Sequence, residues 1–298
     1  MDLERKAIER IKTASEMSLQ HYGKPLVCTY SGGKDSDVML ELFKRSGITF
    51  ELHHNHTTAD APETVYHIRK VFKTAEDQGI KCDIGKPTYK GKRISMWTLI
   101  PQKLMPPTRL VRYCCSILKE AGCPNRMIAT GVRWAESNKR KNRNAFEVLG
   151  KTMKEGIRVS DEKMLLTDND DTRKLFEQCS LKAKTVVNPI IDWQHRDIWE
   201  YIRAEHIETN PLYWKGYKRV GCIGCPMAGK KRWKEFADYP TFKLNYMKAF
   251  DRMLLERRKK GLTFKWTTGE EVFLWWMEDR NISGQQDFQI GKAGELSW

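Results

Sequence analysis

Hydrophobic residues recur every three or four positions near the start of the chain and so share one side of a helix. These positions are Leu3, Ala7, Ile11, Ala14 and Met17. Gly23 and Pro25 follow them, and both residues are typical of the point where a helix ends. The pattern therefore predicts an N-terminal helix within residues 1–23.

A different pattern begins at Leu26, where a short apolar run up to Tyr30 predicts a strand. A glycine-containing loop comes next, and residues 38–43 then return to helical spacing. Further strands are expected at 48–54, 80–84 and 127–130, and a further helix at 63–75. Strands that alternate with helices predict an α/β fold with a doubly wound, mostly parallel sheet, and ligands bind at the carboxyl ends of such strands.

The alternation weakens after about residue 143. Residues 143–184 are polar and charged, and we interpret them as an insertion. Helical spacing returns in the last third of the chain, at 197–202, 242–255 and 270–277. The expected organisation is an N-terminal helix over 1–23, a nucleotide-binding domain over 24–227 and a C-terminal helical region over 228–298.

The first strand leads into the loop Ser31-Gly32-Gly33-Lys34-Asp35-Ser36. Two glycines allow a tight turn that points backbone N–H groups into one concavity, and the following helix adds its positive end, so the loop is suited to phosphate. Lys34 adds a mobile charge, and Ser31 and Ser36 add hydroxyl donors. Asp35 would help to hold Mg²⁺ or cap the helix. A Gly-Gly turn with a capping residue and no ligand is the alternative.

This loop resembles the pyrophosphate loop of the adenine nucleotide α-hydrolase superfamily, whose members cleave ATP between the α and β phosphates or bind sulfonucleotides. Other motifs, over about residues 24–227 except 143–184, are similar to the phosphoadenosine phosphosulfate reductase family. They are Pro62-Glu63-Thr64, Arg112-Tyr113-Cys114 with Lys119, Gly131-Val132-Arg133 with Glu136-Ser137, Asn188-Pro189-Ile190 with Trp193, Asp197-Ile198-Trp199 and Asn210-Pro211-Leu212-Tyr213.

The resemblance implies roles for particular residues. ATP with Mg²⁺ would bind the loop, with Lys34, Asp35 and Arg133 as the catalytic residues. Arg133 and Arg112 would contact a phosphate of the nucleotide or substrate, since a guanidinium binds phosphate oxygens in pairs. Gly131 would lie against the base. For each arginine, an ordinary ion pair is the alternative.

Four of the eight cysteines form a second candidate site, Cys114-Cys115 with Cys222 and Cys225. A two-residue gap lets two thiolates converge on one centre, and four soft ligands indicate zinc or an iron–sulfur cluster. Adjacent cysteines fit one tetrahedral ion poorly, whereas a cubane offers each sulfur a different iron. The pattern favours a [4Fe–4S] cluster, with zinc and unligated thiols as alternatives, and it resembles the cluster-binding branch of the sulfonucleotide reductases.

Reductases of this family use a nucleophilic cysteine in a motif near the C-terminus, and no cysteine follows Cys225 here. The resemblance then points to the cluster-binding ATP pyrophosphatases that support sulfur insertion into nucleic acids, such as the DNA phosphorothioation proteins. Two alternatives stay open. One is a sulfonucleotide reductase that uses Cys123, Cys179 or a partner's thiol, and the other is a regulatory module that binds a nucleotide without turnover.

Charge supports an anionic partner. The 298 residues contain 53 Lys and Arg against 38 Asp and Glu, a net charge of +15. We expect an adenosine nucleotide and a nucleic acid, DNA or RNA, as partners, together with a sulfur donor such as a cysteine desulfurase. The charged N-terminus predicts neither a signal peptide nor a membrane span, and therefore a cytoplasmic protein. Monomer and homo-oligomer both remain open.

Overall fold

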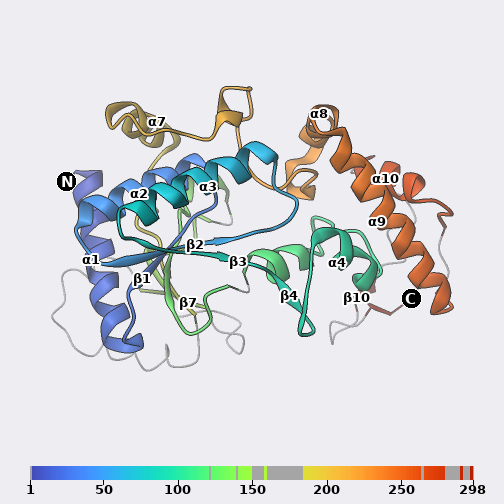
Figure 1. The fold of residues 1–298 in the computed structure, drawn as a ribbon, viewed down its shortest axis with the longest axis horizontal. Helices are drawn as coiled ribbons and strands as arrows, with labels where there is room; N and C mark the ends of the chain where they lie inside the picture. Colours follow the sequence, from blue (N-terminus) through green and yellow to red (C-terminus); the bar gives the residue numbers. More distant parts are fainter. Residues whose placement is uncertain are drawn as a thin grey trace. The chain divides into compact units, whose positions relative to one another are not determined.

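A computed structural model describes most of the chain, which divides into two compact units (Figure 1). The described residues are 2–120, 122–138, 140–149, 158–159, 184–262, 265–278, 289–290 and 296–297. Unit 1 comprises residues 1–56, 60–85 and 121–221. Unit 2 comprises 57–59, 86–120 and 222–298. This division groups all four cysteines of the candidate cluster in unit 2. The domain boundaries expected from the sequence remain predictions.

Unit 1 is built on a seven-stranded sheet in the order β3-β2-β1-β6-β9-β7-β8. The bounds are β1 Leu26–Thr29, β2 Phe50–Asn55, β3 Lys81–Gly85, β6 Met127–Ala129, β7 Phe146–Leu149, β8 Arg158–Val159 and β9 Lys184–Val187. The first five strands of that order are parallel, while β7 and β8 run antiparallel. The doubly wound, mostly parallel sheet expected from the sequence is confirmed.

Helices pack against this sheet through their apolar faces. They are α1 Leu3–Tyr22, α2 Lys34–Ser46, α3 Pro62–Asp77 and α7 His195–Ala204. Leu26 and Cys28 of β1 lie in the same fully buried core as Ile11 of α1, Phe43 of α2 and Ile198 of α7. All four strands and the helices predicted between residues 3 and 202 are present, with ends that shift by a few residues.

The sheet also contains strands that the hydrophobic pattern did not predict. β9 lies between β6 and β7, and β7 falls inside the stretch 143–184 that was interpreted as an insertion. The central residue of β7 that obscures the pattern is Glu147, which is buried yet paired with Arg143 and bonded to the side-chain amide of Asn188. Residues 160–183 lie outside the described part of the chain.

Unit 2 contains two long C-terminal helices and shorter elements from the middle of the chain. Its bounds are hairpin β4 Thr88–Tyr89 and β5 Lys92–Arg93, α4 Met96–Lys103, a π-helical turn at Cys115–Lys119, a 3₁₀ segment at Pro226–Lys231, α8 Arg232–Asp238, α9 Pro240–Lys259 and α10 Gly269–Glu278. Residues 289–290 and 296–297 pair as the antiparallel strands β10 and β11. Tyr246 and Trp276 pack ring to ring at 4.8 Å between α9 and α10. The C-terminal helical region is confirmed.

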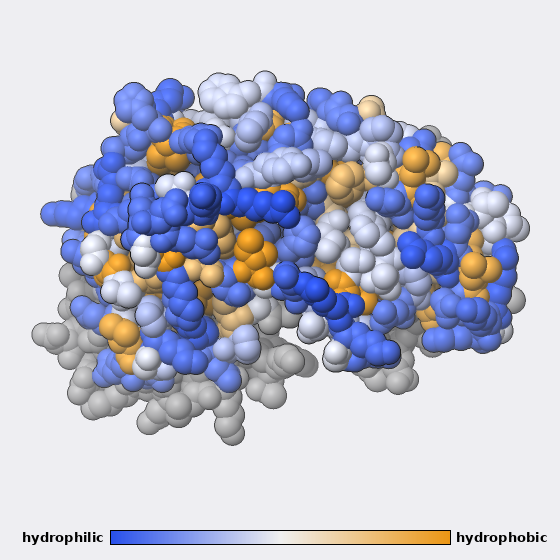
Figure 2. Space-filling model, in the orientation of Figure 1, coloured by the Kyte–Doolittle hydropathy of each residue, from blue (hydrophilic) through white to orange (hydrophobic). Residues whose placement is uncertain are grey.

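No described helix is long and apolar enough to cross a membrane. The face drawn in Figure 2 is mostly hydrophilic, and its hydrophobic side chains form small separate spots.

A buried ion pair ties α1 to the turn that follows β9. The Arg10 guanidinium, with 1% of its side chain exposed, donates to both Asp192 carboxylate oxygens at 2.8 and 3.0 Å and to the Pro189 carbonyl at 2.7 Å. Burial by itself raises the pKa of Asp192, but hydrogen bonds from Arg10 and Lys6 outweigh burial and hold that pKa below its ordinary value.

We expect Asp192→Asn to lower the free energy of unfolding by about 3 kcal/mol at pH 7, because it leaves a buried guanidinium uncompensated. A carboxyl with a depressed folded-state pKa stabilises the fold above its unfolded pKa of about 3.9. The difference between the variant and the parent should therefore shrink below about pH 4. Urea unfolding across pH measures both effects, and Glu9→Gln, in the exposed pair with Arg5 on the same helix, is the control and should cost less than about 0.5 kcal/mol.

Candidate functional site

The loop that joins β1 to α2 makes its turn at Gly32. Gly32 has φ of +72°, in the left-handed region that favours glycine, and a Cβ there would lie 2.9 Å from Cγ1 of Ile68. Gly33 is the N-cap of α2. The Ser36 hydroxyl donates to the Gly33 carbonyl at 2.7 Å and accepts from the Gly33 N–H at 3.1 Å. The loop therefore has one backbone conformation, with the positive end of α2 directed at it.

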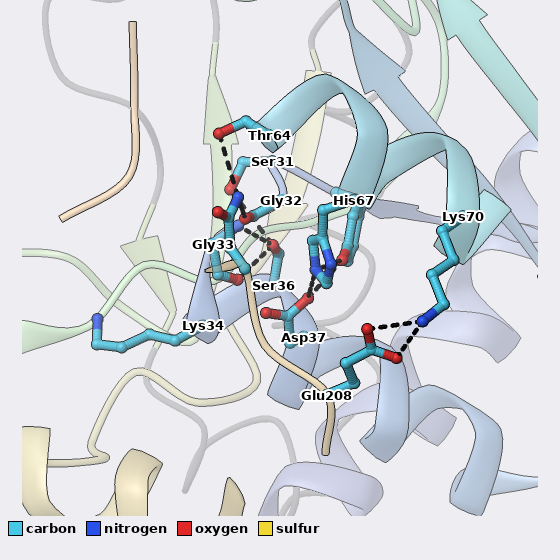
Figure 3. A network of polar contacts seen from close by, with 12 residues as sticks. Ser31, Gly32, Gly33, Lys34, Ser36, Asp37, Thr64, His67, Lys70 and Glu208 are labelled. Atoms are coloured by element: carbon cyan, nitrogen blue, oxygen red, sulfur yellow. Dashed lines mark hydrogen bonds and ion pairs between the residues drawn. The ribbon is translucent and has the colours of Figure 1, made fainter. Parts of the chain in front are cut away.

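Residues far along the chain hold this loop from outside. The buried Asn210 side chain donates to the Gly32 carbonyl at 2.9 Å and to the Thr64 hydroxyl at 3.1 Å (Figure 3). The Tyr213 hydroxyl accepts from the Lys34 backbone N–H at 2.9 Å. That hydroxyl lies where a phosphate oxygen would meet the first turn of α2.

Charged side chains converge on Asp35. The Lys34 ammonium and the Arg133 Nε each lie 2.8 Å from one of its two carboxylate oxygens. Arg133 is 2% exposed, and its Nη1 also donates to the Trp193 carbonyl at 3.2 Å. Asp35 does not cap the helix, because Gly33 occupies the N-cap and Ser36 makes the bonds there. The helix-capping role considered for Asp35 is therefore wrong.

A buried polar group lies beneath the loop. The Tyr30 hydroxyl donates to the Asp37 carboxylate and lies 2.9 Å from Nε2 of His67, and that nitrogen is 3.1 Å from the same carboxylate oxygen. Burial raises the pKa of Asp37, while its bonds from His67 and Tyr30 act in the opposite direction. Figure 3 shows Asp37 facing His67, whereas Lys34 extends away from both. Tyr30 directly follows β1, while Asp37 belongs to α2 and His67 to α3, so the group ties together the elements on either side of the loop.

Sequence analysis assigned no role to three residues of this site. Asn210 and Tyr213 belong to the motif Asn210-Pro211-Leu212-Tyr213, so the motif was the available signal. His195 opens α7, and burial together with the charges of Lys34 and Arg133 lowers its pKa. No sequence pattern marked His195 as part of the site.

The structure brings together in unit 1 the predicted residues Ser31, Gly32, Gly33, Lys34, Asp35, Ser36, Gly131 and Arg133. Gly131 packs on Asp35, since a Cβ at Gly131 would lie 3.4 Å from the Asp35 Cβ. Arg112 belongs to unit 2, where its Nη2 lies 3.1 Å from the sulfur of Cys115. The roles predicted for these residues toward a nucleotide stay predictions.

The four predicted cysteine ligands all lie in unit 2 and influence one another electrostatically. A hydrogen bond from the Cys114 thiol, with Arg112 and Lys119 close by, lowers the pKa of Cys115 to about 6. The bond to Cys115, together with burial, raises the pKa of Cys114. One thiolate in this group is therefore favoured at neutral pH even without a metal.

Gly224, between Cys222 and Cys225, permits the turn that presents these two thiols. It has φ of +72°, and a Cβ there would lie 2.5 Å from Cζ of Phe236. The Gly224 N–H donates to Glu235 at 2.8 Å, and the Cys225 N–H closes the turn on the Cys222 carbonyl at 3.3 Å.

The spacing of the sulfurs bears on which metal centre they suit. Among the described residues, the one group of three or more His, Cys, Asp or Glu ligand atoms within 4.8 Å of one another contains no cysteine. Four thiolates around one zinc, with bonds of about 2.3 Å, would lie about 3.8 Å apart. In the described part of the chain, no three of the four sulfurs lie within 4.8 Å of one another, although Cys114 and Cys115 are hydrogen-bonded. A cubane binds each thiolate through a different iron.

Comparison with known proteins agrees with these features. The model of the phosphoadenosine phosphosulfate reductase domain matches residues 25–228. The chain belongs to this family. An uncharacterized protein of Methanocaldococcus jannaschii is 25% identical over 228 residues, which are 76% of this chain and 47% of that protein. The chain thus spans about half the length of that relative. Adenosine 5′-phosphosulfate reductase of Geobacillus kaustophilus is 23% identical over 69% of this chain and 74% of the reductase.

Solved structures with a similar fold include two enzymes. Phosphoadenylyl-sulfate reductase from Candida auris has a TM-score of 0.43 at 16% identity and covers 74% of this chain and 92% of its own. The U34-tRNA thiolase NcsA from Methanococcus maripaludis, solved with its [4Fe-4S] cluster, has a TM-score of 0.40 at 13% identity. The match covers 97% of this chain and 86% of the thiolase.

We expect Gly32→Ala to weaken binding of ATP with Mg²⁺ by at least about 10-fold, because a Cβ at this positive φ meets Ile68 and must displace the loop. Gly47→Ala is the matched control, since Gly47 has the same φ of +72° but nothing within 4 Å of its Cβ position. It should lose about 1 kcal/mol of stability and keep its ATP affinity. Calorimetric titration with a non-hydrolysable ATP analogue measures the affinities, and equal affinity in both variants would contradict the assignment of the loop.

Proposed function

We propose that this chain is an ATP pyrophosphatase of the phosphoadenosine phosphosulfate reductase family that adenylates an acceptor and supports sulfur transfer to a nucleic acid. The observation that carries the proposal is the loop at Gly32 and Gly33, fixed at the start of α2 with Lys34, Asp35 and Arg133 around it. A fixed set of N–H donors and cations is what a polyphosphate needs.

The residues of unit 1 suit cleavage between the α and β phosphates. Gly32, Gly33 and Ser36 would hold the departing pyrophosphate, and Lys34 and Arg133 would balance the negative charge that develops on it. In the unliganded chain Asp35 occupies both cations, so nucleotide with Mg²⁺ would take over Lys34 and Arg133 while Asp35 turns to the metal ion.

The reaction has three steps. An oxygen of the acceptor attacks the α phosphorus, a new P–O bond forms, and the bond to the β phosphate breaks to release pyrophosphate. A persulfide sulfur on a donor such as a cysteine desulfurase then attacks the acceptor atom that carries the adenylated oxygen, and AMP leaves with that oxygen. A further thiol must then attack the donor's sulfur and break the S–S bond, which leaves a disulfide behind and releases the thiolated acceptor. Energy from ATP is thus used to turn a poor oxygen leaving group into a good one.

The cysteines of unit 2 suit a [4Fe–4S] cluster, which Cys114, Cys115, Cys222 and Cys225 would bind as thiolates. The depressed pKa of Cys115 favours a thiolate ligand. The adjacent Cys114 and Cys115 suit a cubane, which offers each sulfur a different iron, better than a single zinc. Such a cluster, when bound, supplies iron that can hold sulfur. Arg112, at 3.1 Å from the Cys115 sulfur, would hydrogen-bond a ligand thiolate and offset its charge.

The net charge of +15 supports a nucleic acid as the sulfur acceptor. Not every basic residue lies at the surface. Arg232 and Arg257 are each 1% exposed, with Arg232 4.8 Å from the ring of Trp276 and Arg257 bonded to the Leu104 carbonyl, so both serve the core of unit 2. Trp233, which is 49% exposed and adjoins the exposed Lys234, is available for stacking on a base.

We expect the chain to release pyrophosphate and AMP from ATP with Mg²⁺, and DNA or RNA to stimulate the release. Lys34→Ala and Asp35→Ala should each lower the rate by at least about 100-fold, because each removes a charge that acts on the phosphates. Lys44→Ala, an exposed lysine in the last turn of the same helix, is the control and should leave the rate unchanged.

The same assay separates the alternatives. Thioredoxin-dependent sulfite release from a sulfonucleotide, without pyrophosphate release from ATP, would establish a reductase instead. Nucleotide binding with neither turnover would establish a regulatory module.

We expect protein purified without oxygen to contain about four irons and four acid-labile sulfides per chain. Cys225→Ser should abolish or strongly reduce both, since a cubane needs its thiolates, whereas Cys82→Ser, a thiol of β3 in unit 1, should change neither. Iron and sulfide assays with zinc analysis give the readout. Stoichiometric zinc that Cys225→Ser abolishes, with no sulfide, would show a zinc site in place of the cluster.

A further inference from the structure

Two histidines and an aspartate converge at the carboxyl end of β2 in unit 1. One ligand atom from each of His54, His56 and Asp60 lies within 4.8 Å of the other two. In the described part of the chain they are the one such group of three. Neither the phosphate loop nor the cysteines include any of them.

The local sequence explains why the three meet. Side chains two positions apart on an extended chain share a face, so His54 and His56 point to the same side. The extended chain continues past the end of β2, since the His56 N–H donates to the Gly85 carbonyl of β3 at 3.0 Å. Asp60 returns to the same place two residues before α3 begins at Pro62.

His54 has a fixed orientation. Its Nδ1 lies 2.9 Å from the Tyr30 carbonyl oxygen. A carbonyl only accepts, so Nδ1 carries the proton and the lone pair is on Nε2. The ring of Phe72 packs nearly perpendicular to the His54 ring, with the ring centroids 6.5 Å apart and the ring planes at 84°. A metal-bound histidine usually has this arrangement, with its second nitrogen donating to a backbone carbonyl.

The other two groups face His54 from different directions. The His56 ring centroid is 6.5 Å from that of His54, with the rings inclined at 58°. The Asp60 carboxylate acts on His54 electrostatically and favours its charged form, although burial dominates and lowers the pKa of His54. His54 is buried, whereas His56 and Asp60 are half-buried. The group thus has one buried ligand and two ligands nearer to solvent.

We propose that His54, His56 and Asp60 bind a divalent transition-metal ion of the zinc class. Two imidazoles and one carboxylate match that class, while Mg²⁺ prefers oxygen ligands alone. Bonds of about 2.0–2.1 Å bring tetrahedral ligands to about 3.4 Å, so His56 and Asp60 close in slightly on a fixed His54. Three protein ligands leave a fourth position for water or another small ligand. None of the three residues belongs to the phosphate loop or to the four cysteines, so the site goes beyond the proposed function.

Zinc itself is the probe. We expect anaerobically purified protein to take up one zinc per chain in equilibrium dialysis. Zinc-edge X-ray absorption should then show nitrogen and oxygen ligands at about 2.0–2.1 Å from the zinc. His56→Ala and Asp60→Ala should each weaken this binding by roughly 100-fold or more. Both residues are half-buried, so both variants should keep the parent's circular dichroism spectrum.

His53→Gln is the matched control. His53 is the adjacent histidine on the opposite face of β2, where its Nδ1 is 2.8 Å from Asp83, and its variant should bind zinc as the parent does. Unchanged zinc affinity in His56→Ala and Asp60→Ala would overturn the proposal, as would a shell of sulfur alone at about 2.3 Å. A shell of sulfur would assign the zinc to the cysteines and so count against the proposed cluster. The experiment therefore distinguishes a failure of this metal site from a failure of the cluster.

Discussion

The positive φ at Gly32 is the constraint on which the rest of unit 1 depends. It turns the chain from β1 into α2 within four residues, and it directs the Gly32 carbonyl at the buried amide of Asn210. Asn210 also bonds Thr64 on α3, so the loop is fixed to two elements that are distant in sequence. The backbone of the loop is therefore held in one conformation without a ligand.

The polar residues around that turn divide into a hydrogen-bonded set and an ion-paired set. Tyr30, Asp37 and His67 satisfy one another beneath the loop and make its base rigid. Lys34, Asp35 and Arg133 form an ion-paired group above it that a polyphosphate can rearrange, since its charges are paired only through one carboxylate. Stability and chemistry are therefore assigned to different side chains of the same short segment.

Two of the four cysteines of unit 2 are likewise positioned by a turn at a glycine. Because Gly224 has no side chain, it can pack closely against Phe236. The turn at Gly224 then presents the thiols on either side of it. Arg112 and Lys119 supply the positive charge that favours a thiolate at Cys115. Basic residues thus act here on sulfur, while others, such as Arg232 and Arg257, support the aromatic core.

The sequence by itself determined the alternation of strands and helices, and it predicted the phosphate loop and the four cysteine ligands, because each pattern is carried by residues close together in the chain. It did not reveal β7 or β9, since a four-residue strand carries little periodicity and Glu147 interrupts the apolar pattern of β7. Only the tertiary structure decided that Asn210 and Tyr213 support the loop. Only it showed that Arg257 is buried, and that His54, His56 and Asp60 converge. Those facts depend on contacts between distant segments or on the path of a turn, which no local pattern records.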